Sequence, residues 1–290
     1  MIEAQRRLLI DTRFTRPEAV ADAAAKRQRP AALSTTDKLI IIAADHSARG
    51  MLGVGSDAFA MQSRYDLLDR LCTALSNPGV HGVLGTPDIV EDLMLLGALE
   101  NKVVFGSMNR GGLPGSVFEL DDRFGGYNAQ SIVDSGLDGG KMLLRINFAD
   151  SGTANTLFAT ADAVTQLAAA KKVAMVEPFL NVTADGRPRN VLTADAVIQS
   201  MAIASALGAT SAYTWLKVPV VENMERVAEA TSLPIVLLGG DRSDRPDEMY
   251  RSWEEALRLP GVRGLTVGRN LLYPHDDDVA GAVKTAVSLL

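Results

Sequence analysis

The stretch LIIIAADHSARG, residues 39–50, joins an apolar, largely β-branched run directly to a cluster of polar and charged residues. Seven further apolar runs follow: VHGVLG (80–85), KVVFGS (102–107), KMLLRIN (141–147), VAMVEPF (173–179), AYTWLKVPV (212–220), PIVLLGG (234–240) and RGLTVGR (263–269). These runs are nearly continuous rather than alternating, which is typical of parallel strands covered on both faces. The sequence therefore predicts eight parallel strands.

Segments with helical periodicity lie between most of these runs. We expect helices over 64–75, after the cap Thr86 with proline at the first helical position, after Thr193, from Pro246, and through the C-terminal residues. Strands and helices that alternate over about 230 residues predict a single closed (β/α)8 TIM barrel. A doubly wound sheet is the weaker alternative, because no G-x-G-x-x-G follows the first strand.

The first 37 residues differ from the rest of the chain. They read as short helices with a proline-containing break and carry no evident chemistry. We therefore expect a helical N-terminal extension, 1–37, and one barrel domain, 38–290.

Composition excludes several classes of protein. Twenty-nine basic and 35 acidic residues give a net charge of −6, which disfavours a nucleic-acid-binding surface. A single cysteine, Cys72, cannot form an intramolecular disulfide, and no apolar run approaches the ~18–20 residues that span a bilayer. We expect a soluble cytoplasmic protein without a membrane partner.

The active site of such a barrel lies at the carboxyl ends of the strands. Lys217 stands in a strand predicted to be buried on both sides, so its side chain must enter the barrel lumen or disrupt the packing of helices on the sheet. Desolvation there would lower its pKa and leave a free amine able to attack a carbonyl group. The alternative is a lysine near the strand end that extends into solvent.

Three further charged residues are catalytic candidates. Glu177 lies within an apolar run, Asp45 ends the first strand, and Lys141 begins the fourth. A cation at Lys141 would depress the pKa of Lys217, and the carboxylates would move protons or orient hydroxyl groups. The alternatives are a structural ion pair for Glu177, a turn role for Asp45 and a solvent position at the strand start for Lys141.

The ends of the last two strands resemble an anion site. Gly239-Gly240 and Gly268-Arg269 follow strands after which barrels commonly bind phosphate. Ser107, next to Asn109, Arg110 and a glycine-rich loop, and Arg145 are further substrate-binding candidates. The three histidines, His46, His81 and His275, lack a metal-binding spacing, so we predict no metal.

Over roughly residues 38–275 the chain resembles the class I (Schiff-base) aldolases of the TIM-barrel fold. The closest types are the bacterial and archaeal fructose-bisphosphate and the tagatose-bisphosphate groups. The resemblance rests on IIAADHSARG, GGKMLLRIN, MVEPF, WLKVPV, PIVLLGGD and GLTVGRNLLYP. It implies that Lys217 forms the Schiff base and that Asp45, Lys141 and Glu177 occupy catalytic positions.

The resemblance also carries expectations about ligands and assembly. It implies a phosphorylated sugar substrate held by the glycines and Arg269, no metal or organic cofactor, and a homo-oligomer. The fructose-bisphosphate group has a proton-shuttling tyrosine near the end of the fifth strand, where this chain has Glu177-Pro178-Phe179. Another group, Glu177 among the candidates, must then move the proton.

The chain also looks like an actinobacterial branch linked to inositol breakdown. That similarity implies cleavage of 2-deoxy-5-keto-gluconate 6-phosphate to dihydroxyacetone phosphate and malonic semialdehyde. Two other functions stay open. One is a related barrel acyltransferase or thiolase that acts on a phosphorylated dione, and the other is a non-catalytic barrel that binds sugar phosphates.

Overall fold

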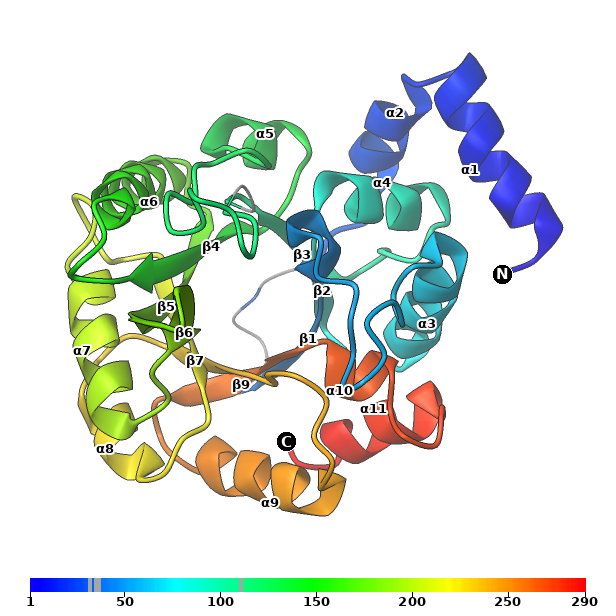
Figure 1. The fold of residues 1–290 in the computed structure, drawn as a ribbon. Helices are drawn as coiled ribbons and strands as arrows, with labels where there is room; N and C mark the ends of the chain where they lie inside the picture. The colour runs from blue at the N-terminus through cyan, green and yellow to red at the C-terminus, as the bar shows by residue number, and fades with distance from the viewer. Residues whose placement is uncertain (31–32, 34–37, 110–111) are drawn as a thin grey trace.

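The computed structural model describes residues 1–30, 33, 38–109 and 112–290. Within these ranges eight parallel strands close into a barrel, which confirms the predicted fold class (Figure 1). In order around the barrel they are β1 (Leu39–Ala44), β2 (Gly82–Gly85), β3 (Val103–Ser107), β4 (Gly139–Ile146), β5 (Val173–Ala184), β7 (Thr214–Pro219), β8 (Ile235–Leu238) and β9 (Val262–Val267). Pairing of β9 with β1 completes the ring.

Helices surround the barrel. They are α1 (Glu3–Thr15), α2 (Ala19–Lys26), α3 (Arg64–Ser76), α4 (Pro87–Leu95), α5 (Ala129–Asp134), α6 (Gly152–Ala169), α7 (Ala194–Ser205), α8 (Met224–Glu229), α9 (Pro246–Leu257), α10 (Arg269–Leu272) and α11 (Val279–Val287). The five predicted helices are present as α3, α4, α7, α9 and α11. Among the described residues no helix is both long and apolar enough to cross a bilayer.

The N-terminal helices α1 and α2 lie outside the ring, and α1 projects away from it (Figure 1). The connection after α2 is held by the buried guanidinium of Arg27, which donates to the backbone oxygens of Lys102 at 2.8 Å and Gly136 at 2.9 Å. Hydrogen bonds to carbonyl groups compensate the cost of burying this charge.

The barrel lumen is apolar toward the amino ends of the strands. Ile41, Ala43, Leu84, Phe105, Met175 and Val236 are all buried in one cluster there. Because successive side chains of a strand point to opposite faces, the next inward positions after Ala43 and Met175 are Asp45 and Glu177. The lumen therefore changes from apolar to charged toward the carboxyl ends.

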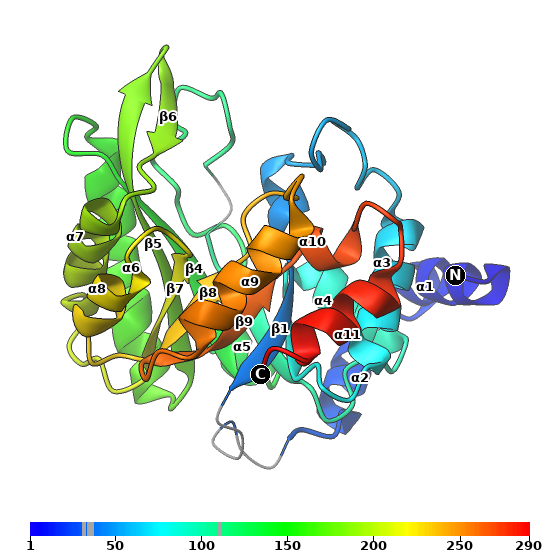
Figure 2. The same ribbon diagram turned by 90° about the horizontal axis from the view of Figure 1, so that it is seen from below.

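One element differs from the sequence expectation, in which the fifth strand ended near Phe179. Strand β5 continues to Ala184 and pairs antiparallel with β6 (Arg187–Asn190). The turn residues Asp185 and Gly186 have φ of 53° and 69°, the left-handed conformations that a tight hairpin turn requires. The hairpin rises above the barrel rim on the side away from α10 (Figure 2).

Candidate active site

A cavity of about 630 Å³ opens at the carboxyl ends of the strands. Residues from several strand ends line it, among them Asp45, Lys141, Arg145, Glu177, Lys217, Gly239, Gly240, Gly268 and Arg269. The cavity therefore contains most of the residues that the sequence singled out. Ser107, which was predicted to bind substrate, does not line the cavity.

The floor of the cavity is a cluster of two lysines and two carboxylates, which we call the lysine–carboxylate cluster (Lys217, Glu177, Lys141 and Asp45). The Lys217 Nζ atom lies 2.9 Å from Glu177 Oε1. The other Glu177 oxygen, Oε2, contacts the Lys141 Nζ atom, which also donates to Asp45 Oδ2 at 3.1 Å. All four side chains are buried, Lys217 being 4% and Lys141 1% exposed. The alternatives of a solvent-extended Lys217 and a solvent-facing Lys141 are therefore wrong.

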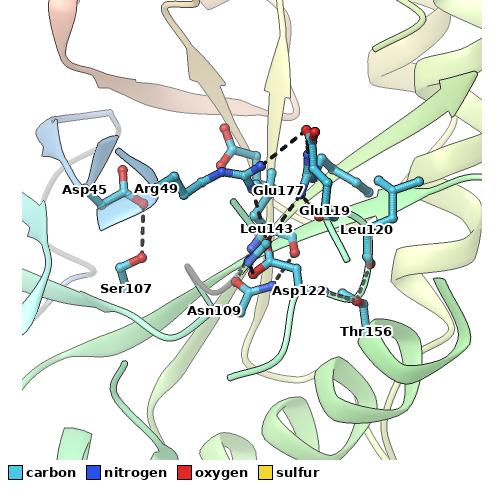
Figure 3. A network of polar contacts seen from close by, with 12 residues as sticks. Asp45, Arg49, Ser107, Asn109, Glu119, Leu120, Asp122, Leu143, Thr156 and Glu177 are labelled. Carbon is cyan, nitrogen blue, oxygen red and sulfur yellow. Dashed lines mark hydrogen bonds and ion pairs between the residues drawn. The ribbon is translucent and has the colours of Figure 1, made fainter. Parts of the chain in front are cut away.

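Ser107 contacts this cluster through Asp45. Its hydroxyl donates to Asp45 Oδ2 at 3.1 Å, and the residue is almost fully buried (Figure 3). In this position Ser107 fixes the orientation of the Asp45 carboxylate.

Burial and charge act in opposite directions on Glu177. Burial would raise the pKa of its carboxyl group, but the ammonium groups of Lys141 and Lys217 outweigh burial and lower the pKa to about 2. Glu177 is therefore ionised at neutral pH.

Burial lowers the pKa of Lys217 below its ordinary value. The Glu177 carboxylate acts in the opposite direction, and the nearby Lys141 ammonium lowers the pKa of Lys217 further. The balance leaves the Lys217 amine easier to deprotonate than a solvent-exposed lysine, which is the condition for a nucleophilic amine.

A second charged group, the arginine–carboxylate cluster (Arg49, Arg145, Glu119 and Asp122), forms another part of the cavity region. Arg49 Nη1 lies 3.1 Å from Asp122 Oδ2 (Figure 3). Arg145 Nη1 lies 2.9 Å from Glu119 Oε1. The Gly112 backbone N–H donates to Asp122 Oδ1. The Asp122 backbone N–H donates to Thr156 Oγ1. The cluster thereby ties the loop after β3 to β4 and to the turn after β1.

The predicted anion site lies at the ends of β8 and β9. The Arg269 Nη1 atom is 3.0 Å from Asp241 Oδ1, and Asn270 donates to the backbone oxygens of Gly239 and Asp241. Gly268 is required by packing, because a Cβ atom there would lie 2.2 Å from the Ala43 oxygen, and Gly240 has φ of 67°. Packing therefore accounts for Gly268, and backbone conformation accounts for Gly240. Arg269 brings a positive charge to this wall.

The other residues that the sequence singled out are the three histidines, Cys72 and Arg110. His81 Nδ1 accepts a hydrogen bond from the Ile40 backbone at 3.0 Å, and His275 Nε2 lies 2.8 Å from the Ser243 oxygen. Cys72 is half-buried on α3. His46 lines the cavity beside Asp45. Arg110, in the polar segment after β3, lies outside the described residues. Among the residues that the structure describes, no three His, Cys, Asp or Glu side chains form a group able to hold a metal ion.

Sequence reasoning missed three features of the cavity. The ion pairs of Arg49 and Arg145 with Glu119 and Asp122 join segments far apart in the chain, and no motif indicates them. The pairing of Asp241 with Arg269 was also missed. The hairpin residue Arg189 lines the cavity. The Asp185-Gly186 pair, a common hairpin dipeptide, was the available signal for that hairpin.

A solved structure matches this chain over its full length at high identity. The crystal structure of Cgl0159 from Corynebacterium glutamicum is 55% identical, with a TM-score of 0.97 over 100% of this chain and 97% of that chain. A search of the curated proteins found no match.

Solved aldolase structures share the fold at much lower identity. An archaeal fructose 1,6-bisphosphate aldolase is 15% identical, with a TM-score of 0.64 over 93% of this chain and 98% of that chain. The fructose-bisphosphate aldolase from Slackia heliotrinireducens is 13% identical, with the same TM-score over 98% and 84%. At these identities the likeness establishes the fold.

A family model also matches this chain. The model described as Cgl0159-like matches residues 37–287, nearly the whole barrel. The chain therefore belongs to the Cgl0159-like family.

Proposed function

We propose that this protein is a class I aldolase that cleaves a phosphorylated keto sugar through a Schiff base on Lys217. The observation that carries the proposal is the buried Lys217 amine, 2.9 Å from Glu177 and facing a cavity large enough for a sugar phosphate. Its pKa is lowered by burial, and a deprotonated amine is the form that attacks a carbonyl carbon.

The proposed reaction begins with the Lys217 nitrogen bonding to the ketone carbon, whose oxygen leaves as water. The resulting iminium accepts the electron pair of the carbon–carbon bond that breaks, while a base takes the proton of the substrate hydroxyl on the departing carbon. The departing part leaves as an aldehyde. The enamine then takes a proton at carbon, and water hydrolyses the iminium to release the second product and the amine.

Glu177 is the proposed base. Its pKa is low only while two ammonium groups face it, so loss of the Lys217 proton makes the carboxylate more basic. Lys141, between Glu177 and Asp45, keeps both carboxylates in place, and Asp45 orients substrate hydroxyls. Arg269 and the backbone around Gly239, Gly240 and Gly268 would hold the phosphate.

Covalent trapping tests the proposal. Borohydride added with 2-deoxy-5-keto-gluconate 6-phosphate, fructose 1,6-bisphosphate or fructose 1-phosphate should give a reduced adduct, and peptide mass spectrometry should find it on Lys217. Glucitol 6-phosphate, which has no carbonyl group, is the control and should give none. Absence of an adduct with every ketose, or an adduct on another lysine, would contradict the mechanism. Tight binding without an adduct would favour a non-catalytic barrel.

The Asp241–Arg269 pair yields a prediction about phosphate affinity. The Asp241 carboxylate, 3.0 Å from Arg269, competes with an incoming phosphate for the guanidinium and repels it. We expect Asp241→Asn to lower the KM of a phosphorylated ketose several-fold, with kcat little changed. Steady-state kinetics at low salt measure the effect.

Asp244→Asn is the matched control, because Asp244 lies in the same loop but its side chain is 93% exposed. Its KM should stay at the wild-type value. An unchanged or higher KM in Asp241→Asn would place the phosphate elsewhere in the cavity.

A further inference from the structure

Thr266 on β9 has a buried hydroxyl group that the fold leaves without a hydrogen bond. The residue is 1% exposed, and its Oγ1 atom has no hydrogen-bond partner among residues 1–30, 33, 38–109 and 112–290. A buried hydroxyl without a partner costs stability, and a valine side chain of the same shape would avoid that cost. Packing of the barrel therefore does not explain the hydroxyl.

The Thr266 side chain points into the barrel lumen and lines the cavity. Thr266 is paired with Ile41 of β1, whose side chain is buried in the lumen, and paired residues of parallel strands share a face of the sheet. Lys141 and Lys217 line the same cavity and are buried to a similar degree. Thr266 therefore belongs to the cavity floor together with these two lysines.

The register of the strands places Thr266 in one layer with both lysines. In such a barrel the inward side chains of alternate strands form layers of four, and tilt of the strands displaces each member by two residues from the one before. Lys217 is paired with Val236 on β8. Leu238, two residues farther along β8, is paired with Thr266. The same step repeated around the ring gives the four members of the layer, Leu84, Lys141, Lys217 and Thr266.

Thr266 lies on the side of Lys217 opposite to Glu177, because the strand order places β7 between β5 and β9. Gly268, at the predicted phosphate site, is two residues beyond Thr266, on the order of 7 Å along the strand. In a ketose phosphate a single methylene group separates the ketone carbon from the phosphate group. A ketose whose phosphate lies at Gly268 and whose ketone carbon meets Lys217 therefore passes over Thr266.

We propose that the Thr266 hydroxyl donates a hydrogen bond to the ketone oxygen of the substrate and keeps it when this oxygen becomes the carbinolamine hydroxyl. The inference rests on the proposed function and adds a substrate-binding residue to it. Attack by the neutral Lys217 amine forms the C–N bond, breaks the C=O π bond and moves one amine proton to the oxygen. The hydroxyl then leaves as water with the proton that Glu177 took from the ammonium form of Lys217, and the nitrogen lone pair forms the iminium.

Two ligands that differ only at the ketone oxygen test the contact. Dihydroxyacetone phosphate has this oxygen, and in 3-hydroxypropyl phosphate a methylene group replaces the carbonyl group. Dissociation constants are measured by calorimetry in the Lys217→Met background, which prevents covalent chemistry. Addition of Thr266→Val should weaken binding of dihydroxyacetone phosphate about five- to tenfold and leave 3-hydroxypropyl phosphate unchanged. Thr266→Ser, which keeps the hydroxyl, should retain most of the affinity.

Thr214→Val is the matched control. Thr214, at the start of β7, also has a buried hydroxyl without a partner in the described part of the chain. It does not line the cavity, and because the next residue, Trp215, packs in the lumen, Thr214 faces the surrounding helices. Neither valine variant should lower the melting temperature, since each exchanges an unpartnered hydroxyl for a methyl group. Thr214→Val should change neither dissociation constant.

A rate measurement tests the contact with the carbinolamine. Negative charge develops on the ketone oxygen as Lys217 attacks, so a hydrogen bond to it strengthens in the transition state. With Lys217 intact and dihydroxyacetone phosphate saturating, Thr266→Val should form the borohydride-reducible adduct about tenfold more slowly. Thr214→Val should form it at the wild-type rate. An unchanged rate in Thr266→Val would reject this part of the inference.

The outcomes separate this inference from the proposed function. Equal losses for the two ligands, no loss in Thr266→Val, the same loss in Thr214→Val, a melting temperature several degrees lower in Thr266→Val, or no binding of dihydroxyacetone phosphate would overturn the role of Thr266. Formation of an adduct in the wild type reports on the aldolase chemistry alone. Adducts without a Thr266 effect reject the inference only, and a Thr266 effect on binding without adducts rejects the aldolase only.

Discussion

Replacement of Lys217 by methionine should lower kcat/KM for carbon–carbon cleavage by on the order of 10⁴-fold or more, because it removes the atom that forms the covalent intermediate. Methionine is close to lysine in length and fills the same buried space without the charge. Glu177 keeps Lys141 as a partner, so its carboxylate is not left alone in the lumen. Substrate binding should therefore survive while turnover and borohydride trapping disappear.

Lys172 provides a matched control. Burial lowers the pKa of Lys172 as well, but this lysine directly precedes β5, at the amino end of the barrel, and donates to the Leu137 oxygen. Lys172→Met should leave kcat/KM and trapping unchanged. Cleavage at more than a few per cent of the wild-type rate in Lys217→Met, or a comparable loss in Lys172→Met, would contradict the assignment of the nucleophile.

The closed barrel could be predicted because each of its strands is buried on both faces. Runs such as LIIIAA and PIVLLGG contain almost no polar residue, so their pattern indicates parallel strands under helices before any pairing is known. The start of a helix could likewise be predicted from the sequence pattern. Thr193 caps α7 through a bond from the Ala196 N–H, as its position before an apolar repeat predicted.

Convergence of the lysine–carboxylate cluster could be predicted from topology alone. Lys217 and Glu177 are 40 residues apart in sequence, but parallel strands bring their carboxyl ends to one rim. A charged residue inside an otherwise apolar strand must then face the lumen or disrupt the packing of the helices. This reasoning predicts which side chains come together, but it does not predict which carboxylate oxygen each ammonium group contacts.

The arginine–carboxylate cluster could not be predicted. Glu119 and Asp122 lie in the irregular segment after β3, where neither period 2 nor period 3.6 fixes the direction of a side chain. Which arginine each would reach depends on the path of that loop. Arg145 was predicted to bind substrate, and no sequence pattern indicated that it would also pair with Glu119.

Glu177→Gln should have the second-largest effect. We expect turnover to fall about 10²- to 10⁴-fold, the usual contribution of a general base, since glutamine cannot accept the substrate proton. The same substitution should ease the first step. The Glu177 carboxylate raises the pKa of Lys217 against the effect of burial, so its removal lowers that pKa further.

The two effects have opposite signs, and this distinguishes a catalytic base from a structural partner. In Glu177→Gln, the rate of borohydride trapping should reach its plateau at a lower pH than in the wild type, while steady-state cleavage is slow at every pH. Glu119→Gln removes a carboxylate from the other cluster, one whose side chain is 11% exposed, and should leave the pH profile of trapping unshifted. If Glu177 only held the lysines in place, its loss would misplace the amine and reduce trapping and cleavage together. Wild-type cleavage in Glu177→Gln with a shifted profile would instead assign the proton transfer to another group, and Asp45, 3.1 Å from Lys141, would be the next to test.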